Sequence, residues 1–179
     1  MKINFDDSAM LVIDIQEKLL PAMYAMEEMF ENSLTLIRGA AQLKLPTIIT
    51  QQYPKGLGFT QKEVTDLLPD SKIFDKMSFS CMTPEVAGEL KEMGRKNIII
   101  CGIESHVCVL QTVMDLVKNG YQPVLVADCV SSRKKSDLKF ALRRAQAEGA
   151  IITTYESVLF ELIDSAKHPE FKEISKIIK

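Results

Sequence analysis

The sequence predicts a three-layer α/β/α fold built on a doubly wound, mostly parallel, six-stranded sheet of Rossmann-like topology. Short apolar runs alternate with amphipathic stretches from one end of the chain to the other. Unbroken runs of Val, Ile and Leu, separated by helices of about 10 to 15 residues, are typical of parallel strands buried on both faces. In addition, Gly94, Gly120 and Gly149 each precede an expected strand by a few residues, where helices end in a left-handed cap.

The expected strands and helices follow one another in alternation along the chain. The apolar runs that predict strands lie at 9–15, 46–50, 98–101, 123–127 and 151–153. The stretches that predict helices are a Met-rich segment after the first strand and residues 34–43, 107–118, 137–148 and 158–163. Thr83 and Pro84 are typical of a helix start, because threonine caps the first turn and proline fits its first position.

Residues 53–80 interrupt this alternation and contain Pro54, Gly56, Gly58 and Pro69. We expect this segment to be a long irregular excursion from the sheet. A loop of that length inside a compact domain is usually functional, so the segment is expected to contribute to a site.

Length, composition and charge exclude several classes of function. The 179 residues, 46% of them hydrophobic, are enough for one sizeable core, so we expect a single domain over residues 1–179. The net charge of −2, with both signs interspersed, offers no broad basic field to nucleic acid or to a membrane. No apolar run has signal-peptide character or approaches the roughly 20 residues that cross a bilayer, so a cytoplasmic protein is expected.

The four cysteines, at positions 81, 101, 108 and 129, form no CxxC pair and have no histidine at zinc-binding spacing. Neither a zinc site nor a redox dithiol is therefore expected. Cys101 and Cys129 lie at the ends of apolar strands and are expected to be small buried hydrophobic residues.

Cys108 lies where an expected strand breaks at Gly102 and the chain restarts as a helix. A thiol in the first turn of a helix is close to unsatisfied N–H groups and to the positive end of the dipole, so we expect its pKa to be lowered. Such a thiol is a candidate nucleophile. The alternative is an inert buried thiol, since free cysteine is among the most buried residue types.

Asp14 and Lys76 are the groups expected to assist this thiol. Asp14 ends the first strand, and ligands of open α/β sheets bind outside the carboxyl ends of the strands. If the strand of Asp14 neighbours the strand before Cys108, both residues face one crevice, where the carboxylate can exchange a proton with the thiol. Lys76, in Phe74-Asp75-Lys76-Met-Ser-Phe-Ser80, can supply the cation that holds a thiolate and a carboxylate together.

Three motifs carry a family resemblance: Leu11-Val-Ile-Asp14-Ile-Gln16, Asp75-Lys76-Met-Ser-Phe-Ser80 and Gly102-Ile-Glu-Ser-His-Val-Cys108-Val109. In order and approximate spacing, they resemble the motifs of the isochorismatase-like cysteine hydrolases, which include nicotinamidases and N-carbamoylsarcosine amidases. The resemblance covers nearly the whole chain. The stretch Gln51-Gln-Tyr-Pro-Lys-Gly-Leu-Gly58 is similar to that of a metal-free, largely uncharacterised subgroup.

The resemblance implies a catalytic triad of Asp14, Lys76 and Cys108. It also implies a cis peptide bond between Ile103 and Glu104, and an oxyanion hole formed by the backbone N–H groups of Glu104 and Cys108. The implied reaction is attack of the cysteine on an amide, ureide or carbamoyl-type carbon of a small molecule, with a thioester intermediate. Members of the family commonly assemble, so a homo-oligomer, a dimer or larger, is expected.

Departures from the nicotinamidase and isochorismatase patterns bear on the cofactor and on the substrate. Residues 50–58 contain no histidine or carboxylate where nicotinamidases bind a metal, so we expect neither a metal nor another cofactor. The presence of the cysteine favours acyl chemistry over cleavage of a vinyl ether. Gln16, Tyr53 and Phe79 flank the motifs and are expected to form walls of the substrate pocket, with the two rings favouring a flat or apolar group.

Other interpretations remain open at this stage. A non-catalytic or redox-responsive member of the same fold would keep the thiol pocket but bind a metabolite or a partner. A dinucleotide-binding oxidoreductase is disfavoured, because the glycine fingerprint is missing after the first strand. Arg133 is a candidate for structural support or for binding an anionic substrate group, whereas His106 lies on a tight turn and is not expected to reach the Cys108 sulfur.

Overall fold

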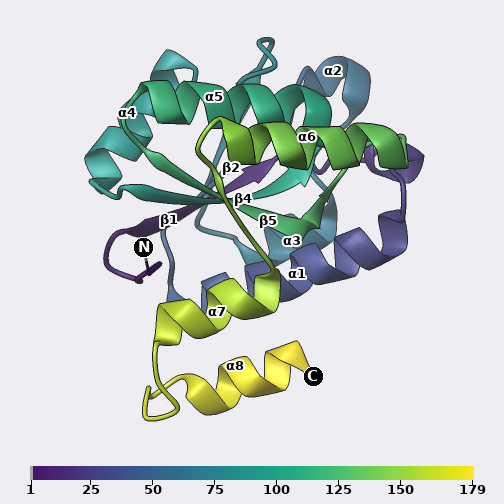
Figure 1. Cartoon of the computed structure of the whole chain (residues 1–179). Helices are drawn as coiled ribbons and strands as arrows, with labels where there is room; N and C mark the ends of the chain where they lie inside the picture. The colour runs from purple at the N-terminus through teal and green to yellow at the C-terminus, as the bar shows by residue number, and fades with distance from the viewer. Residues whose placement is uncertain (1) are drawn as a thin grey trace.

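The computed structural model describes residues 2–179 and has three layers, with helices on both sides of a parallel sheet (Figure 1). In this part of the chain, six strands are hydrogen-bonded in the order β3-β2-β1-β4-β5-β6, all parallel. They are β1 (Ser8–Ile13), β2 (Thr47–Gln52), β3 (Lys72–Lys76), β4 (Asn97–Ile103), β5 (Gln122–Ser131) and β6 (Ile151–Thr153). The chain winds outwards from β1 to β3, returns to β4 beside β1, and winds outwards again. The predicted doubly wound fold is confirmed.

The helices cover the two faces of the sheet unequally. On one face lie α4 (Pro84–Met93), α5 (Leu110–Lys118) and α6 (Lys135–Ala147), with the π-helical turn η2 (Ser105–Val109) leading into α5 (Figure 1). On the other lie α1 (Met26–Leu43) and α7 (Tyr155–Ile163), with α8 (Phe171–Ile178) packed outside them. The remaining short elements are η1 (Leu20–Ala22), α2 (Pro54–Leu57) and α3 (Lys62–Leu67). Within residues 2–179, no helix has the length and apolar character needed to span a membrane.

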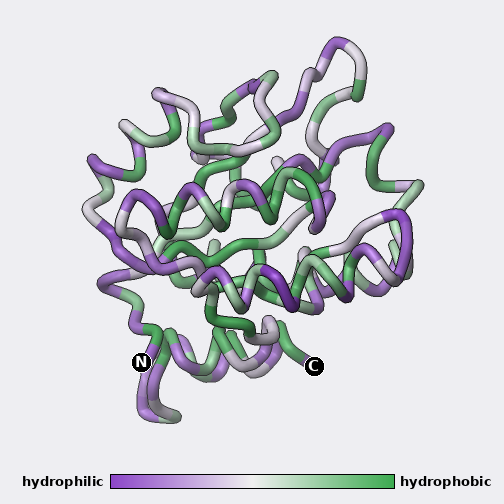
Figure 2. The backbone as a smooth tube through the Cα atoms, turned by 45° about the horizontal axis from the view of Figure 1, so that its top comes forward, coloured by the Kyte–Doolittle hydropathy of each residue, from purple (hydrophilic) through white to green (hydrophobic). Residues whose placement is uncertain are grey.

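The apolar core lies on both faces of the sheet because the side chains of each strand alternate between them. Met10 and Val12 of β1 pack in the cluster under α1 and α7, whereas Leu11 and Ile13 pack in the cluster under α4 and α5. Figure 2 shows the hydrophobic stretches of the chain gathered in the interior of the molecule. Burial on both sides explains why the strands are unbroken apolar runs rather than alternating ones.

The predicted helix ends are present in the structure. Gly94, Gly120 and Gly149 have φ of 62°, 82° and 106° and lie within two residues of the ends of α4, α5 and α6. The Thr83 side chain accepts a hydrogen bond from the Val86 N–H, which caps α4. These caps therefore follow from the amino-acid sequence alone.

Residues 53–80 differ from the prediction, which treated them as irregular. They contain α2, α3 and the strand β3. β3 is the one strand of the sheet in residues 2–179 that none of the five expected apolar runs indicated. The strand lacks an apolar run because it lies at the edge of the sheet, where Lys72, Ile73 and Asp75 are exposed. An edge strand whose side chains are mostly exposed does not need an unbroken run of apolar residues. It therefore lacks the pattern by which β1 and β4 can be predicted from the sequence.

Candidate active site

The proposed catalytic residues lie at the carboxyl ends of neighbouring strands. Asp14 directly follows β1, Lys76 ends β3, and Cys108 lies in η2 just after β4. Strand β2 separates β1 from β3, so the carboxylate and the ammonium approach each other across the end of β2. Because β1 also neighbours β4, the cysteine joins them at the point where the strand order reverses.

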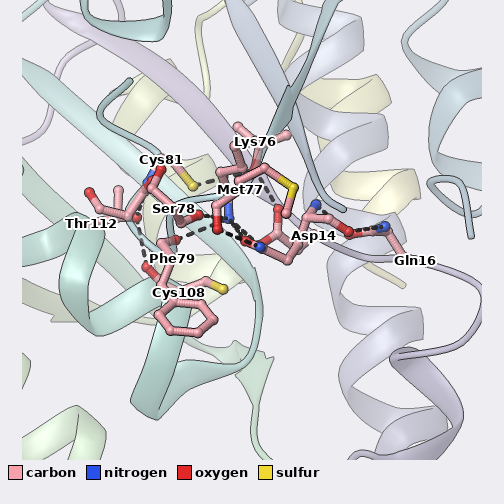
Figure 3. Close-up of polar contacts among 12 residues, drawn as sticks. Asp14, Gln16, Lys76, Met77, Ser78, Phe79, Cys81, Cys108 and Thr112 are labelled. Carbon is pink, nitrogen blue, oxygen red and sulfur yellow. Dashed lines mark hydrogen bonds and ion pairs between the residues drawn. The ribbon is translucent and has the colours of Figure 1, made fainter. Parts of the chain in front are cut away.

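Asp14 and Lys76 form a buried ion pair. The Lys76 Nζ lies 2.7 Å from the Asp14 Oδ2, with the side chains 1% and 0% exposed. The same ammonium donates to the Gln52 Oε1 at 2.8 Å and to the carbonyl oxygens of Phe79 and Ser78 at 3.0 and 3.3 Å. Figure 3 shows the lysine and the aspartate pointing at one another, with the segment from Met77 to Phe79 wrapped around them. A buried charge is tolerated when it is paired and hydrogen-bonded in this way.

The second oxygen of the Asp14 carboxylate is held by Thr50 of β2. The Thr50 hydroxyl donates to the Asp14 Oδ1 at 2.8 Å and also contacts the Cys81 sulfur at 3.3 Å. Asp14 itself has a positive φ of 51°, so the chain turns sharply where β1 ends. Each carboxylate oxygen therefore has its own donor.

Cys108 is 5% exposed and lies next to this ion pair (Figure 3). Its carbonyl oxygen accepts a hydrogen bond from the Thr112 hydroxyl at 2.7 Å, and the same hydroxyl accepts one from the Cys81 N–H at 2.9 Å. Thr112 thus ties the backbone at Cys81 to the helix that carries the candidate nucleophile.

The expectation of a lowered pKa for Cys108 is wrong. Burial raises the pKa of the Cys108 thiol well above its ordinary value, and the charge of Asp14 raises it further, while Lys76 lowers it in part. Loss of solvent around the buried sulfur outweighs the dipole of a short π-helical turn. These shifts favour a protonated Cys108 thiol beside the Asp14–Lys76 pair.

The electrostatics of Lys76 and Cys81 complete this picture. Burial lowers the pKa of Lys76, but its electrostatic interactions with Cys81, Asp14 and Cys108 raise it more, so the net shift is upward. Lys76 therefore stays charged. Burial raises the pKa of Cys81 to about 12, so this thiol keeps its proton.

The segment before Cys108 has an unusual backbone. The Ile103–Glu104 peptide bond is cis, and the Glu104 side chain is 7% exposed. The Arg133 guanidinium donates to both Glu104 oxygens, from Nε at 3.1 Å and from Nη2 at 2.9 Å. Arg133 therefore supports the loop, as one of its two expected roles required. His106 has its Nδ1 2.9 Å from the Ser132 hydroxyl, which occupies one side of its ring.

The three expected pocket residues are placed differently. Tyr53 and Phe79 are 45% and 53% exposed, so their rings are open to solvent beside the site. Gln16 is fully buried, and its amide donates to the carbonyl oxygens of Gln52 and Gly58 and accepts from the Gln52 N–H. Gln16 is therefore not exposed to a pocket, because its amide is hydrogen-bonded to the backbone at Gln52 and Gly58.

Sequence reasoning missed the side chains that support the ion pair, namely Thr50, Gln52 and Cys81. Thr50 and Gln52 lie two residues apart on one strand, so both point to the same face. That alternation is visible in the sequence. Their contact with Asp14 and Lys76 depends on the register of β2 against β1 and β3, which the sequence does not state.

A cavity of about 630 Å³ lies away from the triad and is a less suitable site. It is lined by residues that include Gln51, Thr60 and Asp75. The Gln51 amide donates to Asp75 at 2.9 Å and accepts from the N–H and hydroxyl of Thr60. These polar groups are already paired with one another, which leaves few anchors for a ligand.

Comparison with known protein families gives a match to the isochorismatase domain over residues 8–157. The chain is 41% identical over 178 residues to isochorismatase domain-containing protein 2 of Xenopus laevis, covering 99% of this chain and 86% of that protein. It is also 41% identical over 177 residues to the secreted isochorismatase effector Isc1 of Phytophthora sojae, covering 96% and 84%.

Solved structures resemble the chain over nearly its whole length. The structure of MAR1 ribonuclease from Caenorhabditis elegans has a TM-score of 0.95 and 42% sequence identity, covering 99% of this chain and 92% of that one. The Escherichia coli YcaC gene product, described as an octameric hydrolase of unknown specificity, has a TM-score of 0.89 and 23% identity, covering 98% and 95%. At that identity the second likeness concerns the fold.

Proposed function

The chain belongs to the isochorismatase family, and from this premise we propose that it is a cysteine hydrolase that cleaves an amide, ureide or carbamoyl-type C–N bond of a small molecule. The observation that carries the proposal is the buried Asp14–Lys76 pair beside the Cys108 thiol. Such a group of nucleophile, base and cation has the composition needed for acyl transfer.

In the first half of the proposed reaction, Asp14 takes the proton of Cys108 while the sulfur attacks the acyl carbon. The carbonyl π bond breaks, and its electron pair forms the oxyanion. Backbone N–H groups of Glu104 and Cys108 are proposed to bind that oxyanion, and each such donor is typically worth about 3 to 4 kcal/mol of the barrier. Lys76 stabilises the negative charge that Asp14 and the sulfur share before transfer is complete.

In the second half, the tetrahedral intermediate collapses and the C–N bond breaks. Asp14 returns its proton to the departing nitrogen, which leaves as ammonia or an amine, and a thioester remains on Cys108. A water molecule then attacks the thioester, with Asp14 again accepting a proton. Collapse of the second intermediate releases the acid and restores the thiol.

The ribonuclease name of the nematode structure raises RNA as another substrate for this chain. The observations favour a small molecule. The net charge is −2, and Arg133, which lies beside the site, is engaged by Glu104. Recognition of RNA relies on basic groups for the phosphates.

We also propose an oligomeric state and a cellular location for the protein. A homo-oligomer, a dimer or larger, is supported by the exposed side chains of Phe59, Met77 and Phe140. A cytoplasmic location is supported by four free, buried cysteines in residues 2–179, since disulfides are rare in reducing compartments. The Phytophthora sojae relative is secreted by name.

Replacing the nucleophile tests the proposal directly. Amides, ureides and carbamoyl compounds are screened with the unmodified protein for release of ammonia or amine, and the hits are repeated with Cys108→Ala. We expect the variant to lose turnover while its thermal melting stays close to that of the parent. Turnover retained in Cys108→Ala would contradict the assignment of the nucleophile. A screen without any hit, together with an unreactive Cys108, would favour the non-catalytic binding member.

A further inference from the structure

We propose that Thr50, supported by Cys81, is a positioning residue that holds the Asp14 carboxylate in its orientation toward Cys108 and Lys76. The inference rests on the proposed function, in which Asp14 moves the proton of Cys108. It adds a residue that acts through Asp14 and does not itself contact the reacting atoms.

The hydrogen bonds around Thr50 fix their own direction. Its hydroxyl lies 2.8 Å from the Asp14 Oδ1 and 3.3 Å from the Cys81 sulfur. A carboxylate accepts only, so the single hydroxyl proton of Thr50 goes to Asp14. The contact with Cys81 is then donated by the thiol, which keeps its proton because burial raises its pKa to about 12. The chain therefore runs from Cys81 through Thr50 to Asp14.

The backbone of Thr50 strengthens the same contact. Thr50 pairs with Ile13 in the register of β1 and β2, and its carbonyl oxygen accepts from the Asp14 N–H at 3.2 Å. One residue thus holds Asp14 by its main chain and by its side chain. Thr50 is fully buried, where a hydroxyl costs free energy unless it is hydrogen-bonded, so an apolar strand residue would otherwise be expected here.

The two carboxylate oxygens of Asp14 consequently accept hydrogen bonds from different donors. Oδ2 receives the Lys76 ammonium, and Oδ1 is pinned by Thr50, so the carboxylate cannot rotate freely about its own axis. The titratable groups that face Asp14 are Lys76 from β3, Cys81 from the loop before α4 and Cys108 from η2. In the proposed reaction one proton passes between Asp14 and Cys108, so the pH dependence of Cys108 alkylation reports both groups together. A hydrogen-bond donor stabilises the charged form of its acceptor, so removal of the Thr50 hydroxyl is expected to move that dependence to higher pH.

The test follows alkylation of Cys108 by iodoacetamide as a function of pH, with the modified peptide identified by mass spectrometry. The acid limb of this profile reports the first proton lost by the Asp14–Cys108 pair. In Thr50→Val, which keeps the shape and removes the hydroxyl, we expect the midpoint of that limb to move upwards by about one pH unit. Thr50→Ser keeps the donor and should leave the midpoint in place.

Thr47→Val is the matched control. Thr47 lies at the other end of the same strand, is also buried, and bonds the Leu45 carbonyl oxygen at 2.9 Å. Its profile should coincide with that of the parent protein. Thermal melting of each variant verifies that the profiles compare folded proteins. A Thr50→Val profile that superimposes on the parent profile would overturn the proposal.

Two further comparisons keep the result decisive. Should Thr50→Val fail to fold, Cys81→Ala is compared with Cys81→Ser: the first should raise the midpoint and the second should not, and equal midpoints would overturn the chain from Cys81. Asp14→Asn should abolish the acid limb altogether. A limb that persists in Asp14→Asn would count against Asp14 as the base, and hence against the proposed function, whatever Thr50 does.

Discussion

Asp14 and Lys76 are each stabilised by the presence of the other. Both side chains are almost without solvent contact, and their charges lie 2.7 Å apart. Taking a single ion out of water costs several kcal/mol, which the partner and the surrounding hydrogen bonds offset. The stability of the fold therefore depends on keeping both charges together.

Removing one charge of this pair should lower the free energy of unfolding more than removing both charges does. Lys76→Met leaves the Asp14 carboxylate buried and unpaired, so we expect the free energy of unfolding to fall by about 3 to 5 kcal/mol. The double variant Asp14→Asn/Lys76→Met should recover part of that loss, although it remains inactive. Urea denaturation at neutral pH measures both effects.

Lys72→Met is the control for this comparison. Lys72 pairs with Glu89 at the surface, with its side chain 59% exposed, and such pairs contribute little. Its unfolding transition should lie close to that of the parent. A double variant less stable than Lys76→Met alone would contradict the unpaired-charge explanation.

The proposed catalytic residues could be found from the sequence, whereas their supports could not. Asp14, Lys76 and Cys108 stand in motifs. The motif of Asp14 ends an expected strand and that of Cys108 begins an expected helix, whereas the motif of Lys76 lies in the segment that was expected to be irregular. Thr50 and Cys81 lie in no such motif. Their importance arises from strand register and from a loop that returns to the sheet, both of which are long-range properties. The pKa of Cys108 was misjudged for the same reason, since burial depends on the whole fold.

At the scale of elements, the close approach of β1 and β4 determines where the site can form. Gly102 lies near the end of β4 with φ of 126°, and it pairs with Ile13, the residue before Asp14. A Cβ at this position would lie 2.0 Å from the Ile13 carbonyl oxygen. That oxygen belongs to the backbone of a central strand and cannot move aside as a flexible side chain can.

Gly102→Ala should therefore disrupt the sheet at the site. Backbone strain and the overlap with Ile13 together should lower the free energy of unfolding by at least about 3 kcal/mol and reduce activity. Thermal melting and alkylation of Cys108 measure the two consequences.

Gly88→Ala is the control for this prediction, because the same glycine-to-alanine change should here raise the free energy of unfolding. Gly88 lies inside α4, and nothing lies within 4 Å of the position its Cβ would occupy. Alanine is favoured over glycine in a helix interior, so we expect a gain of about 0.5 to 1 kcal/mol. Similar losses in both variants would show that the contact with Ile13 is not the cause.

The elements differ in how far the sequence reveals them. β1 and β4 are buried on both faces, so their apolar runs are unmistakable. β3 lies at the edge with most of its side chains exposed, and residues 53–80 were expected to be irregular for that reason. The strand that supplies Lys76 is thus the one with the weakest apolar signal, and Lys76 was located through its motif instead.

At the scale of the whole molecule, buried thiols make stability depend on pH. The pKa of Cys101 is raised by burial to about 12, and that of Cys81 is raised similarly. Cysteines in the unfolded chain titrate near about 8.5. The folded state therefore holds these protons more tightly. The stability that these protonated thiols contribute to the folded state is fully present below the unfolded-state pKa. It is lost progressively as the pH rises towards about 12.

The protein should accordingly become easier to unfold in alkali. Each buried thiol is expected to remove about 1.4 kcal/mol of stability per pH unit above about pH 9. Urea denaturation at pH 7.5, 9 and 10 measures the slope for the parent and for Cys101→Ala, which lacks one titrating group. The variant should lose stability less steeply, and parallel slopes would contradict the role of this thiol.

The order of the three proposed catalytic residues along the chain has a consequence for synthesis of the protein. Asp14 belongs to the first strand, Lys76 to the third, and the cysteine follows the fourth. A ribosome therefore delivers the acid and the ammonium before the sulfur. A nascent chain that stops short of β4 therefore contains Asp14 and Lys76 but lacks Cys108.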